Sequence, residues 1–215
     1  MLSTSNPNGS KQGSRSRRAA KQQRLPFHGG PRQNSGRQRG NRTSHAARPR
    51  FEKPTPVHVT LRMRSHVWNL RSQRCYRRIC AAFEKARGRF GARLVEYSVQ
   101  GNHLHLIIEA DDGAALSRAM QGLTIRIAKA LNALMDRAGR VFDDHYFSRL
   151  LRTPTELVRA IRYVLANAAH HFGRSSADPF SSQALPKATP LLAEPVSWLL
   201  RKGALRVDPL LVLRW

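Results

Sequence analysis

Residues 100–109 read QGNHLHLIIE, and this stretch decides the fold of the chain. Two histidines flank a leucine and lead into apolar, β-branched residues, and this period of two predicts a strand. Successive side chains of a strand point to opposite faces of a sheet. We therefore expect His103 and His105 on one face, and Leu104, Leu106 and Ile108 on the other.

The histidine pair predicts a metal site. Side chains two positions apart on a strand are separated by about 7 Å, so two imidazoles can converge on one divalent cation. The alternative is a solvated sheet face with two polar side chains and no ligand. The remaining sequence favours the metal site.

Both parts of the chain are strongly basic. The 215 residues include 38 Lys and Arg against 13 Asp and Glu, a net charge of +25. Residues 1–50 hold 12 of the basic residues and none of the acids. Such an excess favours a polyanionic partner through counterion release, and nucleic acid is the commonest such partner. A membrane surface is disfavoured because the chain has no basic amphipathic helix with bulky apolar residues in its tail and no run of about 18 apolar residues.

Residues 1–52 are predicted to be a disordered basic tail. They are rich in Ser, Gly, Asn, Gln and Arg and contain almost no aliphatic residues, so they bury too little surface to offset their chain entropy. The N-terminus lacks the apolar segment of a signal peptide. Cys75 and Cys80 are spaced so that helical side chains do not face each other. We expect reduced thiols and a cytoplasmic protein.

The predicted elements follow the order βαββαβ. Alternating apolar residues predict strands, and apolar stripes at helical spacing predict helices. The strands are expected at 57–64, 93–100, 103–109 and 145–152, and the helices at 71–90 and 111–139. This order is typical of the ferredoxin-like α+β fold, an antiparallel sheet with both helices on one face.

The other face of this sheet is expected to be open and polar. Strand parity assigns Val95, Tyr97 and Val99 to the helix side. The open face is expected to carry His58, Arg62, Arg64, Glu96, Gln100, His103 and His105.

A further helix is predicted after residue 152. Thr153-Pro154-Thr155-Glu156 is a capping box with proline at the first helical position. Tyr163 and Asn167 lie one turn apart on the flank of its apolar stripe. A tyrosine in this place is typical of amphipathic packing. The alternative is that Tyr163 works beside the metal, and that the amide oxygen of Asn167 completes the metal site when the helix crosses the open face.

Two motifs together carry a resemblance to a known family. Asn102-His103-Leu104-His105 in a strand is followed about sixty residues later by Tyr163-Val164-Leu165-Ala166-Asn167 in a helix. This pair resembles the single-tyrosine transposases of the His-hydrophobic-His superfamily, and is most similar to their branch associated with repetitive extragenic palindromes in bacteria. The similarity covers roughly residues 55–172. Residues 195–203 resemble the C-terminal segment of that branch more weakly.

The resemblance implies a metal-dependent DNA strand transferase. Tyr163 would attack a phosphodiester of single-stranded DNA, form a 5′-phosphotyrosine and release a 3′-hydroxyl. His103 and His105 match the metal ligands of the family, which generally uses Mg²⁺ or Mn²⁺, and Asn167 stands where mobile members usually have glutamine. A cation suits a tyrosine nucleophile because a phenol with a pKa near 10 is weak without help. Tyr146 is the competing nucleophile.

The rival interpretation is a non-catalytic nucleic-acid-binding protein on the same fold, because RNA-recognition domains share this sheet. A chain that binds palindromic DNA but has lost strand transfer is a third. The expected partner of the transposase is single-stranded or hairpin DNA, and a homodimer is possible. The DNA contacts are expected at His58, Arg62, Arg64, Gln100 and Arg152. We expect the transposase domain at 53–173, and a linker with a C-terminal tail segment at 174–215.

Overall fold

The computed structural model describes residues 50–172, 177–186 and 189–211, and of residues 167–172 the backbone alone. Every described residue belongs to one compact unit, Asn41–Trp215. The predicted basic tail therefore lies outside the described residues, except for positions 50–52.

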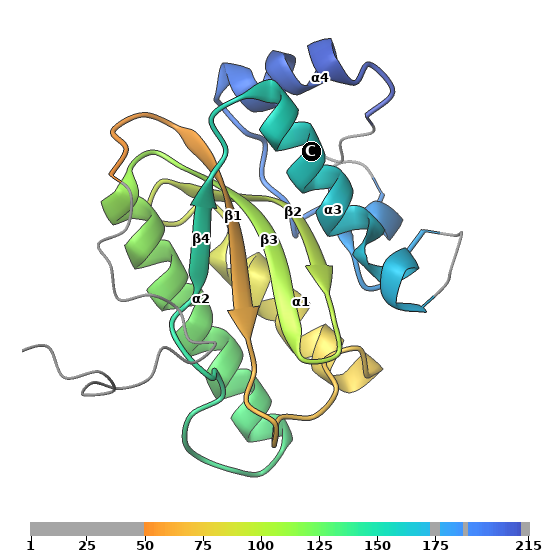
Figure 1. The fold of residues 1–215 in the computed structure, drawn as a ribbon. Coiled ribbons are helices and arrows are strands. Elements are labelled where there is room, and N and C mark those ends of the chain that lie inside the picture. The colour runs from red at the N-terminus through yellow and green to blue at the C-terminus, as the bar shows by residue number, and fades with distance from the viewer. Residues whose placement is uncertain (1–49, 173–176, 187–188, 212–215) are drawn as a thin grey trace, which may run out of the picture. The chain divides into compact units, whose positions relative to one another are not determined.

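Four strands form one antiparallel sheet. They are β1 (Thr55–Arg62), β2 (Ala92–Val99), β3 (His103–Ala110) and β4 (Phe147–Leu150). Their order across the sheet is β2-β3-β1-β4, and every neighbouring pair is antiparallel (Figure 1). With one helix after β1 and one after β3, this is the ferredoxin-like arrangement. The predicted α+β fold is confirmed.

Two helices cover one face of this sheet (Figure 1). α1 (Gln73–Ala86) and α2 (Gly113–Leu134) begin at Ser72 and Asp112, whose side chains accept backbone N–H groups of the first turn. Apolar side chains of the strands and of both helices form the larger core. Its fully buried members include Val59, Leu61, Ile79, Phe83, Tyr97, Leu104, Leu106, Met120 and Ile127.

β2 contains an irregularity that overturns one expectation. Its register with β3 shifts between Leu94 and Glu96, which is a β-bulge around Val95. A bulge inserts one residue and interrupts the alternation of faces. Val95 therefore packs in a second apolar cluster, away from Tyr97 and the larger core. The prediction that Val95 faces α1 and α2 is wrong.

α3 (Pro154–Phe172) lies across the other face of the sheet (Figure 1). Its apolar stripe and the strands beneath it make up the second apolar cluster. The buried members are Val95, Ile107, Leu151, Leu157, Val158, Ile161, Val164, Leu200 and Ala204. The face that the sequence predicts as open is thus partly covered by this added helix.

We call the described residues after α3, 177–186 and 189–211, the C-terminal segment. Residues 180–182 and 193 lie against β2, and residues 199–207 pack against α3. The segment contains the short helical turns η1 (Ser182–Ala184) and η2 (Leu199–Gly203) and the helix α4 (Ala204–Val207). Ser181 forms a β-bridge with Ser98. The polar edge of β2 is therefore paired with backbone of the same chain.

Buried carboxylates hold the C-terminal segment. Glu109 of β3 is fully buried and accepts the backbone N–H groups of Val196 and Ser197, both at 2.8 Å. Asp178 is 3% exposed and accepts two hydrogen bonds from the guanidinium of Arg71, at 2.7 and 2.8 Å. A two-point arginine–carboxylate pair fixes orientation as well as distance.

Cys75 is buried and Cys80 is half-buried, and both are free thiols. Burial raises the pKa of the Cys80 thiol. Within the described ranges, no helix has the length and apolar character needed to cross a membrane.

We predict that Asp178→Ala lowers the free energy of unfolding by about 3 kcal/mol, because it leaves the nearly buried Arg71 guanidinium without its carboxylate. Chemical denaturation followed by circular dichroism measures this loss. Glu194→Ala is the matched control: it also removes an acid of the C-terminal segment, but its pair with Arg201 is 3.6 Å long and largely exposed. The control should change stability by less than about 0.5 kcal/mol. Equal losses from both variants would contradict an anchoring role for the Arg71–Asp178 pair.

Candidate active site

The central strands bring the candidate residues together through their register. In the antiparallel pairing of β1 with β3, Thr60 is opposite His105 and Arg62 is opposite His103. Directly opposite residues share a face of the sheet. His103 and His105 therefore stand on the face that α3 crosses, while Leu104 and its alternate neighbours fill the larger core.

His105 is the centre of the site and is 5% exposed. Its Nδ1 lies 3.2 Å from Nε2 of His58 and 3.3 Å from Oγ1 of Thr60. The rings of His103 and His105 have centroids 4.8 Å apart and are nearly perpendicular. Nδ1 of His103 lies 2.8 Å from Oδ1 of Asn102. An amide oxygen only accepts hydrogen bonds, so this Nδ1 carries the proton and the lone pair of His103 is on Nε2.

Tyr163 of α3 lies beside these histidines. Its ring centroid is 5.2 Å from that of His105 and 5.9 Å from that of His58, both in edge-to-face geometry. The residue is 50% exposed. The structure thus brings a solvent-accessible phenol from a later helix to the imidazoles of the two central strands.

The start of α3 fixes where Tyr163 falls. The N–H of Glu156 donates to Oγ1 of Thr153, and the Glu156 carboxylate accepts the N–H groups of Arg152 and Thr153. This is the predicted capping box. The backbone N–H of Arg152, followed by that of Thr153, holds the pKa of Glu156 below its ordinary value. The helix therefore begins at a defined residue, from which Tyr163 lies between two and three turns along.

The other tyrosines are in different surroundings. Tyr97 is fully buried and Tyr76 is half-buried, and their hydroxyls are 2.8 Å apart. Burial raises the pKa of both phenols well above the ordinary value. Tyr146, the competing candidate, is 7% exposed and belongs to the larger core on the helix side of the sheet. Of the four tyrosines, Tyr163 is the exposed one beside the histidines.

His58 is a neutral member of this group. Burial, and after it the positive charge of Arg149, lowers the pKa of His58 to about 4. Arg149 is opposite His58 in the pairing of β1 with β4. His58 is therefore uncharged at neutral pH, and it can share a hydrogen bond with His105 without adding positive charge next to that ring.

The remaining predicted residues are spread around this group. Arg62, Arg64 and Arg152 are exposed. Gln100 is 2% exposed and donates to Oγ of Ser98 at 2.7 Å, so its side chain is unsuited to the predicted DNA contact. Asn167 belongs to α3, but its side chain lies outside the described part of the structure.

Sequence reasoning missed three neighbours of the site: Thr60, Arg149 and Phe147. Phe147 of β4 is opposite Thr60 and is 53% exposed. The alternation within residues 147–150 could have placed Phe147 and Arg149 on one face. The sequence of a four-residue strand does not specify its register with a neighbouring strand. The partners of Phe147 and Arg149 on β1 therefore could not be predicted.

The family model described as "Transposase IS200 like" matches residues 55–164, about half of the chain. The chain belongs to this family of transposases. The matched range contains His103, His105 and Tyr163, and it ends before Asn167. The family resemblance inferred from the motifs is confirmed. No curated protein matches the chain.

A solved structure titled "Structure of the REP associates tyrosine transposase bound to a REP hairpin" is similar in fold to this transposase. Its TM-score is 0.53 and its sequence identity 17%, over 65% of this chain and 82% of that chain. At this identity the similarity concerns the fold. It supports the ferredoxin-like arrangement independently of the motifs.

Proposed function

We propose that this transposase cleaves and rejoins single-stranded or hairpin DNA, with Tyr163 as the nucleophile. The observation that carries the proposal is the position of an exposed phenol 5.2 Å, between ring centroids, from the ring of His105. Buried phenols cannot reach a polymeric substrate, and the other three tyrosines are wholly or half buried. A covalent intermediate divides one difficult transfer into two easier ones.

In the proposed step, Oη of Tyr163 attacks the scissile phosphorus and forms a bond to the 5′ phosphate. The bond from phosphorus to O3′ breaks, and the departing oxygen takes a proton to become a 3′-hydroxyl. The phenolic proton leaves to water, to which the half-exposed Tyr163 has access. The reverse attack by a 3′-hydroxyl restores a phosphodiester and the free tyrosine, so the DNA is rejoined without an external energy source.

The donor atoms of the site suit a divalent cation. His103 presents its lone pair on Nε2, and Nδ1 of His105 is engaged by His58 and Thr60. Partners on the second ring nitrogen are typical of metal-binding histidines because they fix the tautomer. We propose that His103 and His105 hold Mg²⁺ or Mn²⁺. The bound cation would polarise the scissile phosphate and stabilise the charge that develops on it.

The two histidines do not complete such a site by themselves. In the described ranges, no group of three or more His, Cys, Asp or Glu side chains is arranged to hold a metal. Mg²⁺ and Mn²⁺ favour oxygen ligands. We therefore propose that oxygen atoms supply the remaining positions, from the amide of Asn167 and from the DNA phosphate.

The surface beside the site suits a DNA strand. Arg62, Arg64, Arg149 and Arg152 are exposed around the sheet face, and guanidinium groups bind phosphates. Phe147 adds an exposed ring on which an unpaired base can stack. The solved transposase of similar fold is described as bound to a REP hairpin, and a hairpin with single-stranded flanks is the substrate that we propose here. The tyrosine and the histidines belong to one chain, so a second copy is not needed to supply the nucleophile.

We predict that Tyr163→Phe abolishes covalent attachment to DNA while it leaves DNA affinity within about twofold, because only the attacking oxygen is removed. The assay incubates the protein with hairpin DNA and Mn²⁺ and resolves the protein–DNA adduct by denaturing electrophoresis. Tyr146→Phe is the control and should form the adduct as the unaltered protein does. A full yield of adduct from Tyr163→Phe would assign the reaction to another residue. Binding without any adduct from the unaltered protein would leave a non-catalytic DNA-binding protein.

A second prediction concerns the metal. EDTA should abolish the adduct and excess Mn²⁺ should restore it. His103→Ala and His105→Ala should each weaken Mn²⁺ binding by about tenfold or more in isothermal titration calorimetry, since each removes a ligand. The exposed His66, outside the site, provides the control variant His66→Ala, which should bind Mn²⁺ as before. An adduct that forms at the same rate in EDTA would refute the metal requirement.

A further inference from the structure

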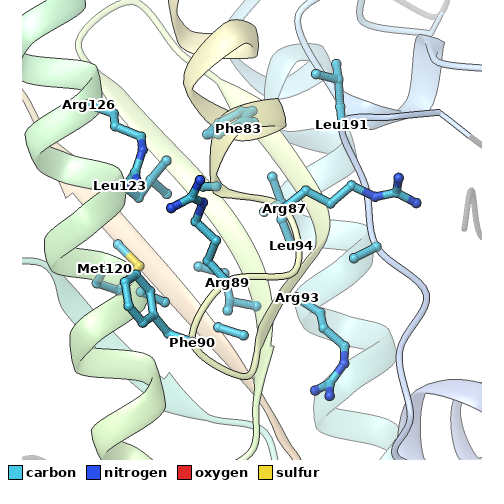
Figure 2. Close-up of a pocket in the computed structure, with 15 residues that line it drawn as sticks. Phe83, Arg87, Arg89, Phe90, Arg93, Leu94, Met120, Leu123, Arg126 and Leu191 are labelled. Carbon is cyan, nitrogen blue, oxygen red and sulfur yellow. The ribbon is translucent and has the colours of Figure 1, made fainter.

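A separate pocket lies on the helix side of the sheet, between α1, α2 and β2 (Figure 2). Its floor is apolar and consists of Phe83, Leu94, Ile108, Met120 and Leu123, of which Leu94 is half-buried and the other four belong to the buried core. α1 and α2 cover the face of the sheet opposite to α3 (Figure 1), so this pocket is distinct from the histidine site.

Four arginines surround this apolar floor. Arg87, Arg89 and Arg93 come from the end of α1 and the start of β2, and Arg126 comes from α2 (Figure 2). Arg93 pairs with Asp111 at 2.8 Å and with Glu109 at 3.4 Å. The others form no ion pair with a carboxylate of the described residues. The pocket therefore combines an apolar floor with three guanidinium groups that have no described counter-charge.

The turn between α1 and β2 holds an aromatic ring at the edge of the pocket. Phe90 has a φ of 59°, in the left-handed region that side-chain-bearing residues rarely adopt, and it stands between Gly88 and Gly91 with φ of 67° and 68°. It is 46% exposed. A strained backbone that displays an apolar ring to solvent is a feature that function explains better than stability does.

The facing surface of α2 is shaped to accept this ring. A Cβ added at Gly122 would lie 3.4 Å from Cε2 of Phe90 and 2.8 Å from Nη1 of Arg126. The guanidinium of Arg126 donates to the carbonyl of Gly122 at 2.8 Å. The missing side chain at position 122 thus lets an aromatic ring and a guanidinium lie together at the mouth of the pocket.

We propose that this pocket binds an unpaired nucleotide of the DNA strand that flanks the hairpin. The base stacks on the exposed ring of Phe90 at the rim of the pocket, and the adjoining phosphates bind Arg87, Arg89 and Arg126. Aromatic rings beside a basic groove are the usual means of binding single strands, because every base has a flat apolar face. The inference rests on the proposed function, which supplies single-stranded DNA as the substrate.

A duplex is the less suitable occupant. Its bases are stacked and paired, so it offers phosphates to the arginines but no free base face to the ring of Phe90. An acidic peptide with an aromatic residue has the same general chemistry as a nucleotide, and the experiment below separates it from DNA.

The test compares two DNA ligands by fluorescence anisotropy: a hairpin with single-stranded extensions and the same hairpin cut flush. We expect Phe90→Leu, which keeps the apolar volume but removes the ring, to weaken binding of the extended hairpin by about fivefold or more. The triple variant Arg87→Gln, Arg89→Gln, Arg126→Gln should weaken it similarly, and should reduce the dependence of log affinity on log salt by about two units, since each single-strand phosphate contributes about 0.7. Both should bind the flush hairpin within about twofold of the unaltered protein.

The matched control removes the same charge elsewhere on the helix side. Arg74, Arg77 and Arg78 are exposed on α1 outside the pocket, and their triple change to Gln should affect both ligands alike and only weakly. Thermal unfolding of each variant confirms that the fold is kept. Equal effects of the two triple variants, or equal losses for extended and flush hairpins, would overturn the inference. So would pocket variants that bind DNA normally but lose an acidic, tryptophan-containing peptide.

The failure of this inference can be told apart from failure of the proposed function. At saturating DNA the pocket variants should form the Tyr163 adduct at the rate of the unaltered protein, because they alter binding and not the reacting groups. An unaltered protein that forms the adduct but binds extended and flush hairpins equally well would refute the pocket alone. A protein that binds no hairpin DNA would refute both.

Discussion

The packing of α3 on the sheet is the interaction on which the candidate site depends. Leu157, Ile161 and Val164 of α3 are buried against Val95 of β2 and Ile107 of β3. Ile107 is two positions from His105 on the same face of β3, so this strand supplies both an apolar contact for α3 and the imidazole next to Tyr163. Loss of the apolar contacts would separate the phenol from the histidines even if Tyr163, His103 and His105 were unchanged.

The C-terminal segment also contacts α3 and helps to hold it on the sheet. Leu200 and Ala204 extend the apolar cluster under α3. Asp208 accepts two hydrogen bonds from the guanidinium of Arg162, the residue before Tyr163, at 2.8 and 3.1 Å. Glu109 accepts the backbone N–H groups of Val196 and Ser197, just before the turn that carries Leu200. The helix with the phenol is thus held between the sheet and the C-terminal segment.

Most of the architecture follows from local patterns in the sequence. The alternation of residues 103–109, the helical stripes and the capping box at Thr153 and Glu156 each carry their own signal, and together they predict the element order and the face that holds the histidines. The bulge at Val95 carries no such signal, because it depends on the register of β2 against β3. For the same reason, the pairing of Arg149 with His58 could not be derived from either strand alone.

The burial of Gln100 is a second feature that the sequence pattern did not predict. Strand parity assigns it correctly to the polar side of β2, but the C-terminal segment pairs with this strand through Ser98 and Ser181. Contacts between segments about eighty residues apart leave no periodic trace in the sequence. The sequence therefore could not predict that Gln100 is buried at the edge of the sheet. The proximity of Tyr163 to His105, in contrast, was expected from the motifs.

The most direct test of the proposed chemistry is to find the amino acid that carries the DNA. The covalent adduct would be digested with nuclease and trypsin, and the modified peptide sequenced by tandem mass spectrometry. The proposed mechanism predicts a nucleotide remnant on the phenolic oxygen of Tyr163, the first residue of the peptide that follows Arg162. A remnant on Tyr146, or on a residue that is not a tyrosine, would contradict it.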